Sequence, residues 1–137
     1  MVGILILTHG GLASELLASA RVIAGELPSF LALPLDWGDD PDQARVKVSR
    51  ALDDLDQGDG VLVLTDIFGG TPSNVALSLQ DQYQIEVVAG VNLPMLVLLG
   101  CQRNRELGLS DLAEWTRAKG RRSIRSAPRS GDREPKS

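Results

Sequence analysis

Four short apolar runs, separated by segments of helical periodicity, limit the folds that this sequence can adopt. The runs are nearly continuous in hydrophobicity, which is typical of strands covered on both faces. They occupy residues 2–7, 30–35, 61–64 and 85–89. Because the connections are short, the alternation predicts an α/β fold with a doubly wound, mostly parallel four-stranded sheet in the order 2-1-3-4 and helices on both faces.

The helices between these runs are predicted from capping residues and apolar stripes. Asp40 and Thr71 each precede a proline, an arrangement favoured at helix starts. Asn92, with Pro94 after it, predicts a fourth helix that ends at Gly100. The expected buried stripes are Leu12, Leu16, Ala20 and Ile23, then Ala44, Val48, Ala51 and Leu55, then Val75, Ala76 and Leu79.

The C-terminal part differs from the rest of the chain in charge. Residues 1–116 contain 16 acidic and 6 basic residues, whereas residues 117–137 contain 2 acidic and 8 basic residues. A fifth helix is expected from about Ser110 to Lys119 with Gly120 ending it, so one domain covers residues 1–120. The basic tail is either solvated or docks, in its first part, on an acidic surface. Nucleic acid is disfavoured as a partner, because the folded part is acidic and the tail has no aromatic residue.

Composition excludes several further classes of protein. The apolar runs are too short to cross a bilayer and no leader precedes Val2, so we expect a cytoplasmic protein without direct membrane insertion. The chain has one cysteine, Cys101, and one histidine, His9. An internal disulfide is therefore impossible and a zinc site is out of reach, and Cys101 is expected to be a small core residue near a helix end.

His9 is expected at the carboxyl end of the first strand, where α/β proteins commonly carry catalytic or binding residues. It ends the first apolar run and is followed by Gly10, Gly11 and a helical segment. A strand that breaks into such a turn presents its last side chains at the carboxyl edge of the sheet, close to helix-start amides. A neutral imidazole there is a nucleophile that can accept a phosphoryl group. The alternative is a structural or merely exposed histidine.

A second polar segment is expected at the same edge. In the order 2-1-3-4 the first and third strands are neighbours, and ligands bind at that switch point. Asp66, which follows the third strand, should then lie beside His9, where a carboxylate fixes the imidazole tautomer and stabilises its growing positive charge. Gly69, Gly70 and Thr71 would surround a phosphate at a helix start. Taken singly, these residues are equally well a strand end, a turn and a helix cap.

Other phosphate and nucleotide sites do not fit the sequence. No P-loop and no dinucleotide-binding glycine pattern follows any of the apolar runs. A phospho-aspartate receiver also places an aspartate after its third strand, but it needs an acidic cluster after the first strand, where this chain has Thr8 and His9. It also needs a late lysine, and none lies within residues 85–94.

At these residues the chain resembles the enzyme IIA component of the mannose family of the bacterial sugar phosphotransferase system. The matching pieces are Thr8-His9-Gly10, residues 66–74, and residues 89–96 (AGVNLPML). They occur in the family's order on the expected elements, and the resemblance covers roughly residues 1–120. One departure is Ile67, which stands where some relatives have a hydroxyl residue.

The resemblance implies a phosphotransferase that carries the phosphoryl group on His9. The donor would be the histidine-containing phosphocarrier protein and the acceptor a IIB component, with Asp66 orienting the histidine and no cofactor, nucleotide or metal required. The phosphate surroundings would be Gly10, Gly69, Gly70 and Thr71. The family also implies a homodimer with an exchanged antiparallel edge strand, here residues 121–127. From its polar, basic composition we expect a disordered tail at residues 128–137.

Two further functions share this chemistry and stay open at the level of sequence. In one, the protein is a regulatory member of the phosphotransferase system without sugar transport, and a protein partner reads its phosphorylation state. In the other, the acceptor is a dihydroxyacetone kinase. We expect any IIB component to be a separate protein. The sugar cannot be identified from this chain, because the sugar contacts would lie on the membrane components.

Overall fold

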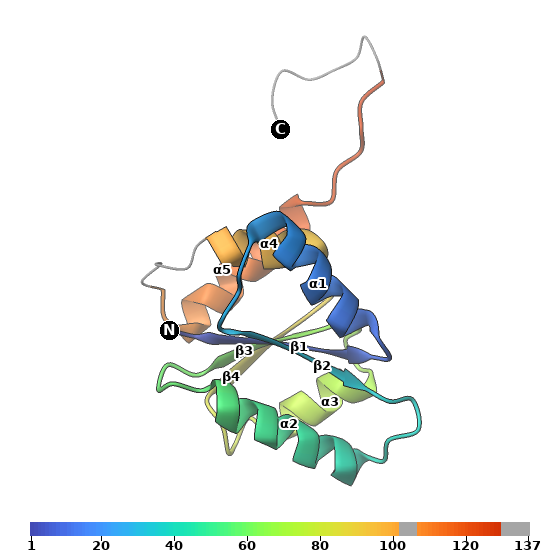
Figure 1. The fold of residues 1–137 in the computed structure, drawn as a ribbon, viewed down its shortest axis with the longest axis vertical. Helices are drawn as coiled ribbons and strands as arrows, with labels where there is room; N and C mark the ends of the chain where they lie inside the picture. The colour runs from blue at the N-terminus through green and yellow to red at the C-terminus, as the bar shows by residue number, and fades with distance from the viewer. Residues whose placement is uncertain (102–106, 130–137) are drawn as a thin grey trace.

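The computed structural model describes residues 1–101 and 107–129, which form an α/β sandwich (Figure 1). The described strands form one sheet, all parallel, in the predicted order β2-β1-β3-β4. The strands are β1 (Gly3–His9), β2 (Phe30–Leu35), β3 (Val61–Thr65) and β4 (Ile85–Ala89). The helices are α1 (Leu12–Ala24), α2 (Pro41–Leu55), α3 (Thr71–Ser78), α4 (Leu93–Cys101) and α5 (Leu109–Arg122).

The register of the sheet brings the ends of three strands together at one edge. His9 at the end of β1 pairs with Leu35 at the end of β2, and Leu7 pairs with Thr65 at the end of β3. Asp66 follows Thr65 directly, so the chain leaves β3 beside the last residue of β1. The predicted switch point between the first and third strands is therefore present.

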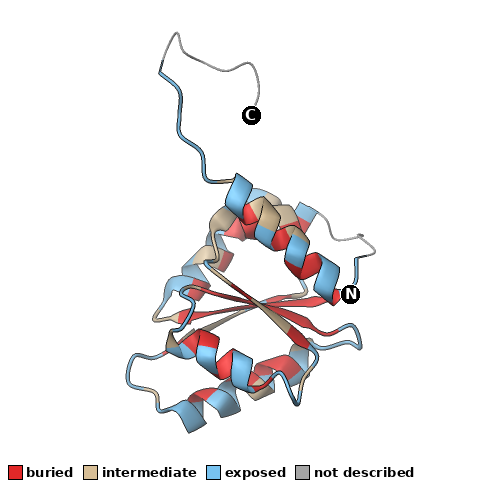
Figure 2. Ribbon diagram, turned by 180° about the vertical axis from the view of Figure 1, so that it is seen from behind, coloured by how far each residue is buried: buried red, intermediate tan, exposed pale blue. Residues whose placement is uncertain are grey.

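The helices cover both faces of the sheet, as predicted. Helices α1, α4 and α5 lie on one face, and α2 and α3 lie on the other (Figure 1). Successive β1 side chains point to opposite faces of the sheet. Ile4 and Ile6 pack against α1, α4 and α5, whereas Leu5 and Leu7 pack against α2 and α3. Figure 2 shows the buried residues concentrated in the strands and on the inner helix faces. Each buried Val, Leu, Ile, Phe or Met side chain contributes about 1.5–3 kcal/mol on burial, so both layers stabilise the sheet.

Two of the three predicted helix starts are confirmed. The Asp40 carboxylate accepts a hydrogen bond from the Gln43 N–H at 2.9 Å, and the Asn92 side-chain oxygen accepts one from the Met95 N–H at 3.1 Å. The prediction that Thr71 caps α3 is wrong, because Thr71 is its first residue and Gly70 occupies the cap position. A glycine is needed there because a Cβ on Gly70 would lie 2.9 Å from His9 Cε1.

The buried stripe of α1 differs from the prediction by a small rotation of the helix. Ala13 and Leu17 are buried together with Ala20, whereas Leu12 and Ile23 are exposed. The predicted stripe favoured the larger side chains. The alanines instead allow close approach to the sheet, and the buried Thr8 hydroxyl fixes the start of α1 by accepting the Ala13 N–H at 2.7 Å.

The C-terminal helix begins where predicted but is longer at its C-terminal end. The prediction that Gly120 ends it is wrong, since α5 continues to Arg122. Gly120 is buried in the helix because the Met95 side chain of α4 occupies the space that a Cβ would need. Ser123 then ends the helix, with its N–H and its hydroxyl both donating to the Lys119 carbonyl.

This longer helix changes the expectation for the exchanged strand. Residues 121 and 122 are helical, so a strand that begins at residue 121 is incompatible with the observed helix. Residues 124–129 form neither helix nor strand within this chain, and pairing of residues 124–127 with a partner stays a prediction. Of the predicted disordered tail, residues 130–137 lie outside the described residues.

Cys101 is the last residue of α4 and is exposed, so the predicted core position is wrong. The buried face of α4 is instead formed by Met95, Leu96, Leu99 and Gly100. Within the described residues, no helix combines the length and the apolar character that crossing a membrane requires.

Candidate functional site

His9 and Asp66 meet at the carboxyl edge of the sheet, as the sequence predicts. His9 Nδ1 lies 2.9 Å from Asp66 Oδ2, and the His9 backbone N–H donates to the same oxygen at 3.0 Å. The other carboxylate oxygen accepts the Ile67 N–H at 2.9 Å. The side chains of His9 and Asp66 are 17% and 11% exposed. The pair is therefore fixed by three hydrogen bonds but remains accessible from outside.

The carboxylate determines which ring nitrogen is free. Burial by itself would raise the pKa of the Asp66 carboxyl, but the hydrogen bonds from the His9 N–H, the His9 ring and the Ile67 N–H together hold this pKa below its ordinary value of 3.8. Asp66 is therefore ionised at neutral pH and can only accept hydrogen bonds. It follows that Nδ1 of His9 carries the proton and that Nε2 has a free lone pair.

The Cε1–Nε2 edge of the ring lies against Gly70 at the start of α3. The position of a Cβ on Gly70 would be 3.5 Å from His9 Nε2, so the glycine leaves this edge of the ring uncovered. Gly70 is the N-cap of α3, and the first turn of a helix presents N–H groups and the positive end of the helix dipole. A nucleophilic nitrogen and an anion-attracting helix end thus share one small space.

The remaining predicted phosphate residues differ in how closely they approach the ring. Thr71 is exposed in the first turn of α3, next to Gly70. Gly69 has a φ of 87°, a backbone conformation that favours glycine, and its carbonyl accepts the Asn74 side-chain amide at 3.2 Å. The Gly10 N–H donates to the Leu35 carbonyl at 2.9 Å and is not free to bind a phosphate.

Trp37 is a residue of this site that the sequence analysis missed. Its indole stacks on the His9 ring, with the ring centroids 4.6 Å apart and the planes inclined by 16°. Gly10 makes room for it, because a Cβ there would lie 3.3 Å from Trp37 Nε1. The available signal was an aromatic residue two positions after the second strand, at the same sheet edge. The switch point joins the first and third strands, whereas Trp37 reaches it from the second.

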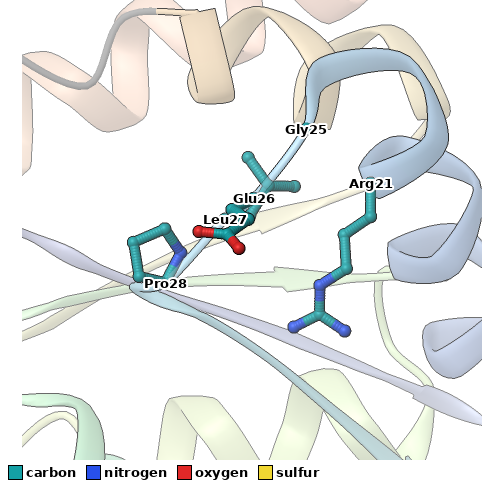
Figure 3. A pocket seen from close by; sticks show the side chains of 5 residues that line it. All are labelled: Arg21, Gly25, Glu26, Leu27 and Pro28. Atoms are coloured by element: carbon teal, nitrogen blue, oxygen red, sulfur yellow. The ribbon is translucent and has the colours of Figure 1, made fainter.

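Two hollows on the surface lie away from this constellation, at the opposite edge of the sheet where the strands begin. One, of about 430 Å³, is lined by Arg21 of α1 and residues 25–28 (Figure 3). The other, of about 450 Å³, lies where β4 and α5 begin. Neither contains a predicted site residue. The described residues hold no group of three or more potential metal-ligating side chains.

Comparison with known proteins gives consistent similarities. The EIIA-man family, described as "PTS system fructose IIA component", matches residues 3–114. The fructose-specific EIIA component of Bacillus subtilis is 34% identical over 125 residues, which are 90% of this chain and 85% of that protein. The mannose-specific EIIAB component of Escherichia coli K12 is 32% identical over 126 residues, or 91% of this chain, which spans only 39% of that longer protein.

A solved structure agrees with the sequence comparisons. The phosphotransferase system component EIIA from Streptococcus agalactiae superposes with a TM-score of 0.83 at 29% identity. The match covers 92% of this chain and 97% of the streptococcal chain.

Proposed function

The chain belongs to the EIIA-man family of IIA components of the sugar phosphotransferase system, and from this premise we propose that His9 is its phosphoryl-carrying residue. Proteins of this kind are phosphotransferases. The observation that carries the proposal is the orientation of the His9 ring: Asp66 accepts a hydrogen bond from the Nδ1–H, and the Cε1–Nε2 edge of the ring lies against Gly70 at the start of α3.

The geometry supports an in-line transfer between two histidines. The lone pair of His9 Nε2 attacks the phosphorus atom of a phosphohistidine on the donor. The new N–P bond forms as the donor's N–P bond breaks, and the bonding electron pair returns to the donor imidazole. No proton needs to leave His9, because Nδ1 keeps its proton and shares it with Asp66. Transfer to the acceptor repeats these steps in reverse, with His9 as the leaving group.

Two features of the site favour the charged species along this path. The ionised Asp66 stabilises the positive charge that the ring gains when Nε2 bonds to phosphorus. The first turn of α3 presents a positive dipole end to the phosphoryl oxygens, and Gly70 allows them close access. Ile67, at the position where some relatives have a hydroxyl, supplies no side-chain hydrogen bond.

We propose the histidine-containing phosphocarrier protein as donor and a IIB component as acceptor, in the cytoplasm. The name of the E. coli relative, a mannose-specific EIIAB component, supports a IIB acceptor. We further propose a homodimer in which residues 124–127 pair as an edge strand with a second subunit. Ile124 is 80% exposed in the single chain, and such pairing would cover it.

Intact-mass measurement tests the proposal. The chain is incubated with phosphoenolpyruvate and the two upstream phosphocarriers, and we expect one added phosphate that is lost in acid, as a phosphohistidine requires. His9→Ala should gain none and keep its fold, since the side chain lies at the surface edge of the sheet. An unlabelled wild type, an acid-stable phosphate or a labelled His9→Ala protein would contradict the assignment.

A further inference from the structure

Trp37 lies at the surface of the protein although it is one of the largest apolar side chains. It belongs to the β2–α2 connection, and the residue is 79% exposed. An exposed indole contributes little to the stability of the fold through burial, so its role is to be found in the groups that it contacts. Here the indole lies nearly parallel to the His9 ring, with 4.6 Å between the centroids.

The connection that carries Trp37 is held in place on both sides of the indole. The Asp36 N–H donates to the Asp39 carboxylate at 3.3 Å, and the Asp39 N–H donates to the Asp36 carbonyl at 3.1 Å. Lys47 of α2 forms an ion pair with Asp39 at 2.7 Å. These contacts fold the connection back on itself and tie it to a helix, so the indole is presented to His9 from an ordered loop.

Three groups together define the position of the imidazole. Asp66 holds the Nδ1 edge, Trp37 covers one face, and Gly70 leaves the Nε2 edge open. The face of an indole attracts a cation, and the imidazole becomes cationic when Nε2 bonds to phosphorus while Nδ1 keeps its proton. The stack therefore strengthens during the transfer step.

We propose that Trp37 is a positioning residue for phosphoryl transfer: its indole holds the His9 ring with Nε2 directed at the incoming phosphorus and stabilises the charge that the ring acquires. The inference rests on the proposed role of His9. The alternative is that Trp37 helps to dock the donor protein. Ile67 and Phe68, which directly follow Asp66, are also apolar and exposed and would suggest such a docking surface. A positioning residue changes the rate of the bound complex, whereas a docking residue changes the donor concentration needed to reach it.

Single-turnover transfer from the phosphorylated donor, measured over a range of donor concentrations, separates the two roles. We expect Trp37→Ala to lower the rate at saturating donor about tenfold, and Trp37→Phe, which keeps an aromatic face, to recover most of it. The control is Trp115→Phe, since Trp115 lies on α5 with the Lys119 ammonium over its ring and contributes nothing to the His9 site. A Trp37→Ala protein whose saturating rate is unchanged would overturn the proposal, even if the half-saturating donor concentration rises.

The stack itself can be tested without phosphorylation. Because His9 is the sole histidine, its two ring C–H proton signals are assignable directly, and the indole ring current should move them upfield in the wild type relative to Trp37→Ala. Equal shifts in the two proteins would show that the rings do not stack and would refute the inference. Failure of the proposed function is a different result: the wild type takes up no phosphate, whatever the ring signals show.

Discussion

Replacing Asp66 by asparagine separates the charge of this side chain from its hydrogen bonds. An asparagine can direct its oxygen at His9 and keep both hydrogen bonds that now reach Asp66 Oδ2. Its amide group then faces the Ile67 N–H and loses the third hydrogen bond. Because Ile67 is exposed, water can replace the lost acceptor. We therefore expect the free energy of unfolding to fall by only about 1 kcal/mol.

The effect on transfer should be much larger, because the carboxylate charge is lost next to the developing imidazolium. Two unit charges at the observed 2.9 Å separation interact by about 3–6 kcal/mol at effective dielectric constants of about 20–40. This corresponds to a loss of about 10²- to 10⁴-fold in the single-turnover rate. The matched control is Asp42→Asn, which removes a carboxylate from the exposed surface of α2 and should leave the rate unchanged.

The assay is single-turnover transfer from the phosphorylated donor, combined with urea unfolding. A mutant that transfers as fast as the wild type would refute the reasoning. So would a rise in the activation free energy of transfer that is no larger than the fall in the free energy of unfolding.

The difference in the free energy of unfolding between wild type and Asp66→Asn should also depend on pH. The folded-state pKa of Asp66 is lowered, so its ionic contribution is complete above the unfolded pKa and is lost as the pH falls through the folded value. The difference in the free energy of unfolding between wild type and Asp66→Asn should therefore become smaller at acidic pH.

Three further perturbations test the surroundings of the site and the ends of the fold. Gly70→Ala brings a Cβ to 2.9 Å from His9 Cε1, so we expect at least about a tenfold slower transfer with a nearly unchanged melting temperature. Gly120→Ala forces Met95 to move and should cost about 1–3 kcal/mol of stability in thermal unfolding, while transfer by the folded protein is preserved. Truncation after residue 123 should abolish a dimer that truncation after residue 127 retains. Identical masses of the two truncated proteins by light scattering would exclude the exchanged strand.

The order of the strands and the meeting of His9 with Asp66 could be predicted because they follow from rules of topology. Buried parallel strands read as continuous apolar runs, and a doubly wound sheet brings the residues after its first and third strands to one edge. The position of the first residue after a strand is determined by the strand that precedes it. A single sequence is therefore enough to pair these two residues.

Other features depended on contacts between elements that a local pattern does not contain. Gly120 is typical of a helix end, yet it lies inside α5 because Met95 packs against it. Thr71 is a common capping residue, yet Gly70 takes that position because the His9 ring lies against it. Trp37 stacks on His9 from a loop that an ion pair between Asp39 and Lys47 links to α2. For Gly120 and Gly70 the deciding partner is distant in sequence, and Trp37 meets a ring on another strand.

The atom that carries the phosphoryl group tests the central claim most directly. With one histidine in the chain, ¹⁵N labelling of histidine gives only two ring nitrogen signals, Nδ1 and Nε2 of His9. After phosphorylation by the upstream carriers, we predict phosphorus coupling at Nε2 and a retained proton at Nδ1, hydrogen-bonded to Asp66. Phosphorus coupling at Nδ1, or a phosphate that couples to neither ring nitrogen, would contradict the account.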